Sequence, residues 1–232
     1  MDRAWGPIIY LSGATATGKG TLGKKLAAQF DFYHISMGDL RRSYLAQLKA
    51  GAPEMDEEVR RYIQEGKIIP EQILKRYNPV PVLLNYHNHR TVGGHSWTVK
   101  LALGMIEEKM AELRSQRPAS RRCKPVIIDG HPLTAGTISI EIVTNYLRVY
   151  SGLTIVTESP RAVAKQRYLS RSRLPSEDAA RFESRMELTN RALPPFLEFM
   201  ALYGEVLRSQ NDENMTIDEA YYALLRKLEH LE

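Results

Sequence analysis

The fold of this chain is decided by the stretch Gly13-Ala14-Thr15-Ala16-Thr17-Gly18-Lys19-Gly20-Thr21. An apolar run at 8–11 leads into it, and apolar residues with helical spacing follow it: Leu22, Leu26, Ala27 and Phe30. A strand, a glycine-rich loop and a helix in this order are the context of a phosphate-binding loop. Glycines let the backbone curl so that its N–H groups face an anion, and the following helix adds the positive end of its dipole.

Lys19 gives this loop its charge. A lysine at this position can reach the outer phosphates of a nucleotide as a mobile cation. The common pattern places Ser or Thr directly after the lysine to serve Mg²⁺, whereas here Gly20 follows and Thr21 comes next. The alternative is a glycine-rich turn that only caps a helix. The lysine, its spacing and both flanks favour the phosphate-binding loop.

Composition predicts one globular domain with inserted subdomains. The chain has 232 residues, and 32 basic against 27 acidic residues give a net charge of +5, which suits polyanions but does not by itself predict nucleic-acid binding. No apolar run approaches the ~20 residues that span a bilayer, and residues 1–6 do not resemble a signal peptide, so we expect no membrane association. The only cysteine, Cys123, allows no internal disulfide, which fits a cytoplasmic protein.

Short apolar runs alternate with helical patterns along the rest of the chain. Strands are expected at 32–36, 125–129, 153–157 and 206–207, and helices at 56–65, 99–113, 138–150, 160–167, from 176 onward, and from a capping box at 216–219. This alternation predicts an α/β fold with a parallel sheet that is covered by helices on both faces.

Asp129 ends one of these expected strands and is followed by Gly130. A carboxylate at the carboxyl end of a parallel strand lies beside the phosphate-binding loop and can hold Mg²⁺ through water. Its alternative role is to cap the turn that follows.

Arginines gather in one later part of the sequence: Arg161, Arg167, Arg171, Arg173, Arg181 and Arg185. A run of like charges is usually a solvated face. A phosphoryl-transfer enzyme, however, needs guanidinium groups that close over the transferring group, and together with the loop this reading is favoured.

Residues 77–97 form an irregular segment with three histidines, His87, His89 and His95. A His-x-His pair can bind one metal ion, but no cysteine or carboxylate accompanies these histidines. A polar surface loop is therefore the favoured interpretation.

The chain resembles the adenylate kinase and nucleoside monophosphate kinase family in two blocks. The first block contains Gly18-Lys19-Gly20-Thr21, then 35–42, followed by a looser match at 66–70; the second contains Asp129-Gly130-His131-Pro132 and the late helix at 185–204. Segment 77–97 has no counterpart. The resemblance implies a single P-loop kinase domain over 1–232, with a core at 1–38 and 124–232. It further implies an acceptor-binding subdomain at about 39–97, including an insertion at about 77–97, and a short lid at about 171–176.

The same resemblance implies the cofactors ATP and Mg²⁺. The loop from Gly13 to Thr21 would bind ATP, Arg167 would lie against the ATP base, and Thr21 and Asp129 would hold Mg²⁺ through water. The phosphoryl chain would be contacted by Lys19, Arg171, Arg173 and Arg185. The acceptor would be bound by Met37, Gly38, Arg42, Ile68, Ile69, Gly130, Leu133 and Thr137.

Departures from the family pattern fall mostly in the acceptor half. Leu133 stands where the family has an arginine, Thr137 where it has a base-reading glutamine, and Met37 where it has a small or hydroxylated residue. In the loop, Thr15 replaces a proline and Ala16 a glycine. The ATP half therefore looks intact and the acceptor half altered.

The resemblance predicts an enzyme that transfers a phosphoryl group from Mg-ATP to a nucleoside monophosphate, with an AMP-like acceptor favoured. Two alternatives stay open: a nucleotide-binding protein with weak or no kinase activity that acts through partners, and a kinase for an unusual or modified nucleotide. The expected partners are small nucleotides, without nucleic acid or membrane, and the expected state is a monomer.

Overall fold

The computed structural model describes residues 7–40, 42–43, 106, 109–113, 115–116, 124–130, 152–171 and 178–230. Two compact units divide the chain, one formed by Met1–Ser36 with Ser120–Glu232 and the other by Met37–Ala119. The predicted helices at 56–65 and 138–150, the insertion at 77–97 and the lid beyond Arg171 lie outside the described ranges. They remain predictions.

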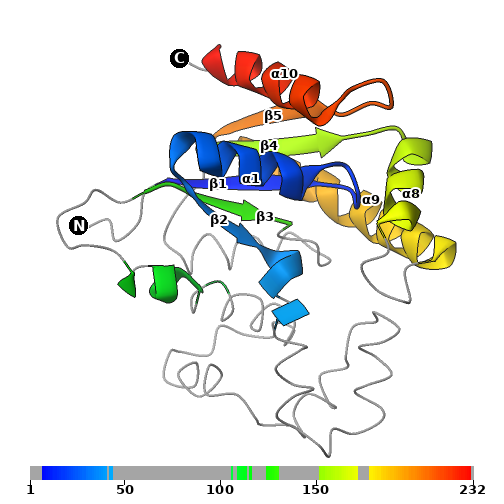
Figure 1. Cartoon of the computed structure of the whole chain (residues 1–232), viewed down its shortest axis with the longest axis horizontal. Helices are drawn as coiled ribbons and strands as arrows, with labels where there is room; N and C mark the ends of the chain where they lie inside the picture. The colour runs from blue at the N-terminus through cyan, green and yellow to red at the C-terminus, as the bar shows by residue number, and fades with distance from the viewer. Residues whose placement is uncertain are drawn as a thin grey trace, which may run out of the picture. The chain divides into compact units, whose positions relative to one another are not determined.

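The first unit is built on a parallel sheet of five strands in the order β2-β3-β1-β4-β5 (Figure 1). The strands are β1 (Ile8–Gly13), β2 (Tyr33–Ser36), β3 (Val126–Asp129), β4 (Leu153–Glu158) and β5 (Glu205–Gln210). The register pairs Leu11 with Asp129 and Gly13 with Thr157, so these strands end at one edge of the sheet. The α/β fold with a parallel sheet is thereby confirmed.

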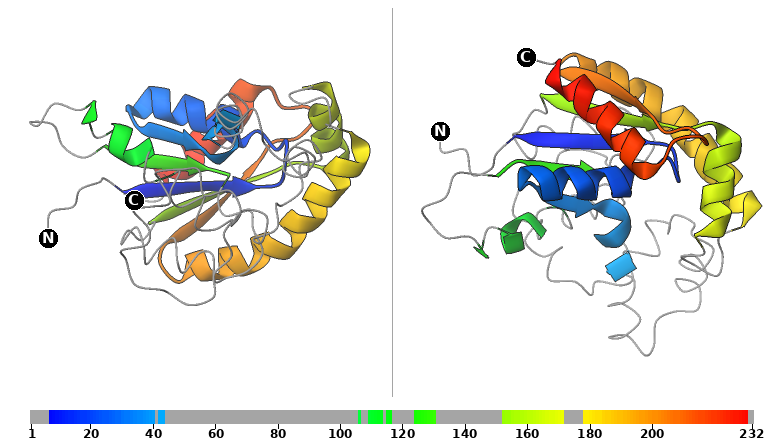
Figure 2. Two further views of the ribbon diagram at one scale, coloured as in Figure 1. Left: turned by 90° about the horizontal axis from the view of Figure 1, so that it is seen from below. Right: turned by 45° about the horizontal axis from the view of Figure 1, so that its top comes forward.

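Helices cover both faces of this sheet, as Figure 2 shows. On one face α1 (Lys19–Phe30) and α10 (Ile217–Glu229) pack side by side, and on the other lies α9 (Ala179–Ala201). The alternation of strand side chains assigns the contacts: Leu11 packs with Leu22 and Leu224, whereas the neighbouring Tyr10 meets Phe196 of α9 edge to face. A further described helix of this unit, α8 (Arg161–Ser170), follows β4.

Most local signals that mark the element ends act as the sequence predicts. Pro160 precedes the first residue of α8, where its missing N–H costs nothing. Thr216 and Glu219 form a complete capping box at the start of α10. Among the residues described, no helix is long and apolar enough to cross a bilayer.

Three local expectations need correction. Phe30 is 44% exposed and stacks on Phe32, because α1 ends there and the chain turns back at Asp31 with φ of 56°. The last strand covers Glu205–Gln210, more than the expected 206–207, because its pairing with β4 continues along polar residues. The long helix was expected from 176 onward but begins at Ala179, because the Asp178 side chain caps it by accepting a hydrogen bond from the Arg181 N–H.

The second unit is described in short pieces. Residues 37–40 and 42–43 are helical. Residues 106 and 109–113, within the predicted helix at 99–113, are also helical, as is 115 just beyond it. Lys109 forms an ion pair with Glu112 one turn further along, at 2.6 Å. These pieces agree with the helical spacing of the sequence there.

Candidate functional site

The glycine-rich loop joins the carboxyl end of β1 to the first turn of α1, at the edge where the parallel strands end. Gly13 and Gly18 have φ of 131° and 96°, a backbone region that glycine enters without strain. A Cβ at Gly13 would overlap the carbonyl oxygen of Thr157, and a Cβ at Gly18 would overlap the side-chain amide of Asn211. Both glycines are therefore required by conformation and by close packing.

Lys19 is the first residue of α1, and its ammonium turns back into the loop. It donates hydrogen bonds to the carbonyl oxygens of Gly13, at 2.8 Å, and of Ala14. Burial lowers the pKa of Lys19 to about 8; the Asp129 carboxylate opposes this shift, and the Arg171 and Arg185 guanidinium groups add to it. A cation that is held in this way is poorly solvated and suited to an anionic ligand.

Ala16 occupies a position in the loop that favours glycine. Its φ is 61°, in the left-handed region that costs an L-residue roughly 1–2 kcal/mol. Its methyl group packs against a buried cluster formed by Ala164, Tyr168 and Phe182. This contact between the loop and helices α8 and α9 offsets part of the conformational cost.

Buried hydrogen bonds support the loop from behind. The Thr17 hydroxyl lies 2.8 Å from the carbonyl oxygen of Ala14 and 2.6 Å from the hydroxyl of Thr157. The Asn211 side-chain amide donates to the carbonyl oxygen of Thr17 at 3.0 Å. Sequence reasoning missed Thr157 and Asn211. Thr157 is a polar residue at the end of a predicted strand, whereas Asn211 directly follows the observed end of β5, beyond the expected 206–207.

Asp129 lies at the carboxyl end of β3 and is only 6% exposed. Its carboxylate faces the first turn of α1, since a Cβ at Gly20 would lie 3.3 Å from Asp129 Oδ2. The same oxygen lies 3.7 Å from His34 Nε2 of β2. Thr21, in the same turn of α1, has an exposed side chain. Within the described residues no group of three or more His, Cys, Asp and Glu side chains is placed to bind a metal ion.

Two of the arginines that the resemblance assigns to the phosphoryl chain, Arg171 and Arg185, lie at this site. Arg171, the residue after α8, directs Nη2 toward the hydroxyl of Thr15 at 3.5 Å, and its guanidinium carbon lies 4.5 Å from the centre of the Tyr168 ring. The guanidinium carbon of Arg185, on α9, lies 5.6 Å from the same ring. Arg173 falls outside the residues described.

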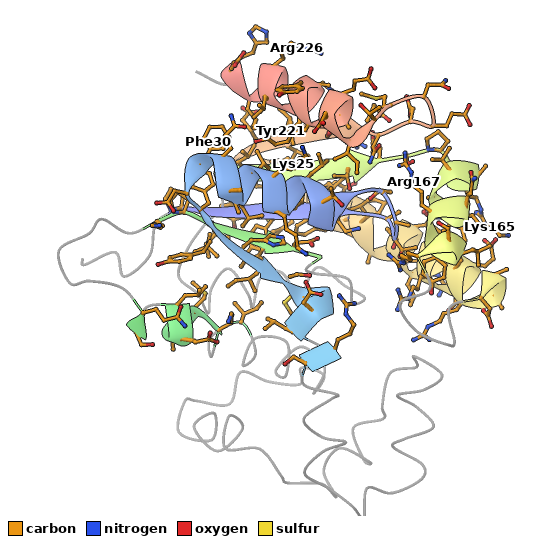
Figure 3. The ribbon with its side chains drawn as sticks, in the orientation of Figure 1. Lys25, Phe30, Lys165, Arg167, Tyr221 and Arg226 are labelled. Atoms are coloured by element: carbon orange, nitrogen blue, oxygen red, sulfur yellow. The ribbon has the colours of Figure 1, made fainter. Side chains whose placement is uncertain are left out.

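The Arg167 side chain binds the segment that joins β5 to α10. Its guanidinium donates to the carbonyl oxygens of Asn211, at 3.1 Å, and Asp212, at 3.0 Å, and lies 3.4 Å from the hydroxyl of Ser159. Figure 3 shows Arg167 on α8, with its side chain toward the segment that joins β5 to α10. Arg167 thus holds the segment from which Asn211 supports the glycine-rich loop.

The predicted acceptor residues are described only in part. Met37, Gly38 and Arg42 belong to the second unit, where Arg42 pairs with Asp39. In the first unit Gly130 follows β3 with φ of 79° and donates its N–H to the carbonyl oxygen of Leu11 at 3.0 Å. The other predicted acceptor residues lie outside the described ranges: Ile68, Ile69, Leu133 and Thr137.

Several curated adenylate kinases are similar to this chain. The chain is 39% identical to the adenylate kinase of Chlamydia muridarum (strain MoPn / Nigg) over 75 residues. These aligned residues make up 32% of this chain and 27% of the relative. This chain is 41% identical over 69 residues to that of Mycoplasmoides gallisepticum, 30% of each chain, and 33% identical over 69 residues to that of Rickettsia rickettsii (strain Sheila Smith), 30% of this chain and 31% of the relative.

The matches span less than a third of the length of these relatives. No protein-family model matches the chain. The five-stranded parallel sheet and the loop that follows its central strand agree with the named relatives in fold class. The resemblance to the adenylate kinase family is therefore confirmed, over a similarity that covers about a third of this chain.

Proposed function

We propose that this chain transfers the terminal phosphoryl group of Mg-ATP to a nucleoside monophosphate, with AMP-like acceptors favoured. The observation that carries the proposal is the set of cations at the loop: Lys19, with Arg171 and Arg185 close enough to lower its pKa. Three cations at a helix N-terminus suit the charge of a triphosphate and of the phosphoryl group in transfer. The relatives' printed name, adenylate kinase, supports the same reaction.

The chain's own groups would act by positioning and by neutralising charge. The N–H groups of the loop and of the first turn of α1 would bind the phosphates, and Lys19 would exchange the carbonyl oxygens of Gly13 and Ala14 for phosphate oxygens. Arg171 and Arg185 would stabilise charge on the transferring group. The attacking oxygen belongs to a phosphate whose second pKa is about 6, so it is ionised at neutral pH and needs no general base.

The donors at the loop fit Mg²⁺. The buried Asp129 carboxylate faces the turn of α1 that carries Thr21, and Mg²⁺ favours oxygen ligands of this kind together with water and substrate phosphates. When bound, the ion would neutralise charge on the terminal phosphates of ATP.

Assignment of the acceptor rests on the resemblance. By it, Met37, Gly38, Arg42, Ile68, Ile69, Gly130, Leu133 and Thr137 would line the acceptor site, and Arg173 would join the lid. Leu133, at a position where the family has an arginine, favours a second candidate: weak activity on AMP, or an acceptor with a different group at that position. Arg42, paired with Asp39, would then be the main cation for the acceptor phosphate.

The test is a panel of AMP, GMP, CMP and UMP incubated with Mg-ATP, with formation of nucleoside diphosphate measured. We expect product from AMP that requires Mg²⁺ and is lost in Lys19→Met. Leu133→Arg is expected to raise kcat/KM for AMP roughly 10- to 100-fold, since one hydrogen bond to a charged group is worth about 1.5–3 kcal/mol. Leu133→Met, uncharged and of similar size, is the matched control. A protein that binds ATP but forms no diphosphate from any acceptor would refute the proposed transfer.

A further inference from the structure

A small aromatic cluster lies beneath the cations of the loop. Tyr168 of α8 and Phe182 of α9 are fully buried, with ring centroids 5.5 Å apart, and Ala164 completes the cluster. Ala16 of the loop packs against it. The cluster therefore joins three segments that the sequence separates: the glycine-rich loop, α8 and α9.

Arg171 and Arg185 both contact one ring of this cluster. The guanidinium carbons of Arg171 and Arg185 lie 4.5 and 5.6 Å from the centroid of the Tyr168 ring, within the ~6 Å range of a cation–π contact. Arg171 directly follows α8 and Arg185 lies on α9, so Tyr168 is the common support of two arginines from different segments. Their charges also reach the loop, because both guanidinium groups lower the pKa of Lys19.

Gathering these cations has an electrostatic cost that the ring can reduce. Arg171, Arg185 and Lys19 carry like charges, which repel one another when they converge on one site. The negative face of an aromatic ring attracts guanidinium groups through its quadrupole, and a buried ring does so in a medium of low polarity. The Tyr168 hydroxyl is buried without a hydrogen-bond partner in the described part of the chain, so the ring, not the hydroxyl, makes the useful contact.

We propose that Tyr168 is a positioning residue whose ring holds Arg171 and Arg185 toward the phosphate chain of a nucleotide bound at the glycine-rich loop. The proposal rests on the proposed function for the ligand, but it concerns polyphosphate binding and so can be tested without turnover. The alternative is that Tyr168 is only a packed core residue.

The first experiment measures the affinity of inorganic tripolyphosphate by calorimetry. Tyr168→Leu, which keeps an apolar side chain but removes the ring, is expected to bind about tenfold more weakly, equivalent to about 1.4 kcal/mol. Tyr168→Phe, which keeps the ring, is expected to stay within about threefold of wild type. The matched control is Phe196→Leu, a buried aromatic residue of the same unit that packs on Tyr10 and should lose stability without losing affinity.

A second series keeps the proposal testable if Tyr168→Leu does not fold. Phenylalanine and its increasingly fluorinated analogues at position 168 keep the shape of the ring while weakening its quadrupole. Affinity for tripolyphosphate should fall stepwise along the series, and the fall should shrink in an Arg185→Ala background, since interacting groups are not additive. A core-packing role predicts constant affinity, and that result would overturn the proposal, as would an equal loss in Phe196→Leu.

The outcomes separate the two proposals. If the acceptor panel yields no diphosphate but the fluorinated series still weakens tripolyphosphate binding, the transfer reaction is refuted and the role of Tyr168 stands. If the wild type forms diphosphate while Tyr168→Leu binds and turns over normally, the role of Tyr168 is refuted and the reaction stands. Wild-type protein that does not bind tripolyphosphate would overturn the role of Tyr168.

Discussion

At the scale of single residues, Lys19 combines two opposed effects. Burial in the loop, together with the Arg171 and Arg185 guanidinium groups, disfavours its charged form, whereas the Asp129 carboxylate favours it, and the net effect is a pKa of about 8. An anionic ligand placed beside the ammonium would stabilise the charge and raise that pKa again. Ligand binding and proton binding at Lys19 are therefore linked.

This linkage predicts a pH dependence of nucleotide affinity. Below about pH 8 Lys19 is charged with or without ligand, so the affinity for ATP is level; above about pH 8 the free protein must take up a proton to bind, so affinity falls by up to about tenfold per pH unit. The second pKa of a phosphate is about 6, so the ATP phosphates do not titrate above pH 8, where the affinity is expected to fall. Calorimetry between pH 7 and 10, in buffers of different ionisation enthalpy, measures both affinity and proton uptake.

Lys19→Met is the control for this titration. Its binding should be weaker at every pH and flat above pH 8. A decline of the same slope in wild type and Lys19→Met would assign the titration to another group.

Ala16 allows a second test at the residue scale. Ala16→Gly removes the left-handed strain, which stabilises the folded protein. It also removes the methyl contact and increases the entropy of the unfolded chain, and both effects destabilise the folded protein. Because these effects oppose one another, the unfolding free energy should change by less than about 1 kcal/mol. Ala16→Val places a β-branched residue at φ of 61° and should destabilise by about 2 kcal/mol or more. Urea denaturation measures both. Ala28→Val, on the exposed face of α1, is the control and should cost about 0.5 kcal/mol; equal losses at 16 and 28 would contradict the strained loop.

At the scale of elements, the loop depends on the segment between β5 and α10. Arg167 of α8 binds the carbonyl oxygens of that segment, and Asn211 within it binds the carbonyl oxygen of Thr17. A chain of hydrogen bonds thus runs from α8 through this segment to the glycine-rich loop. Each link is partly or fully buried, where an unmade hydrogen bond is costly.

We therefore expect Asn211→Ala to lower the unfolding free energy by about 1–3 kcal/mol, because it leaves the Thr17 carbonyl without its buried donor. It should also weaken ATP binding, because Gly18 packs directly on the Asn211 amide. Asn214→Ala, in the same segment but exposed, is the matched control and should change neither quantity. Unfolding in urea measures the first effect, and calorimetric ATP titration measures the second. Unchanged ATP affinity in Asn211→Ala would contradict the role of Asn211 in supporting the glycine-rich loop.

At the scale of the molecule, the candidate site lies at the carboxyl ends of the parallel strands. In the order β2-β3-β1-β4-β5, β1 lies between β3 and β4. After β1 the chain forms β2 and β3 on one side of β1, and then crosses over to form β4 and β5 on the other side. Ligands of open parallel sheets bind where the strand order reverses, outside the carboxyl ends of the strands. Gly13, Asp129 and Thr157 all lie at that edge.

Ligand binding there should stabilise the folded molecule by mass action. Mg-ATP at a hundredfold excess over its Kd should add about 2.7 kcal/mol, which for a chain of this length raises Tm by roughly 5–10 °C. Lys19→Met should abolish most of the rise, whereas Lys24→Met, on the exposed face of α1, should keep it. Differential scanning calorimetry measures all three proteins, and an equal rise in Lys19→Met would place the nucleotide elsewhere.

Local sequence patterns determined much of the secondary structure of this protein. The spacing of glycines and Lys19 predicted the loop, apolar runs predicted the strands, and Thr216 with Glu219 predicted the start of the last helix. These signals succeed because they act within a few residues, through backbone conformation and single hydrogen bonds. The resemblance also assigned Arg171 and Arg185 to the site, though not the ring on which they rest.

Only the tertiary structure decided what stands behind the loop. Thr17 meets Thr157 across 140 residues of sequence and Asn211 across 194, and neither pairing has a local signal. Strand order brings these residues together, so the same patterns in another order would leave the loop without their support. Likewise the exposure of Phe30 follows from where α1 ends, not from its helical spacing. The sequence by itself determined which segments form the candidate site, because those signals are local. The packing of distant strands and helices decided which side chains hold those segments in place.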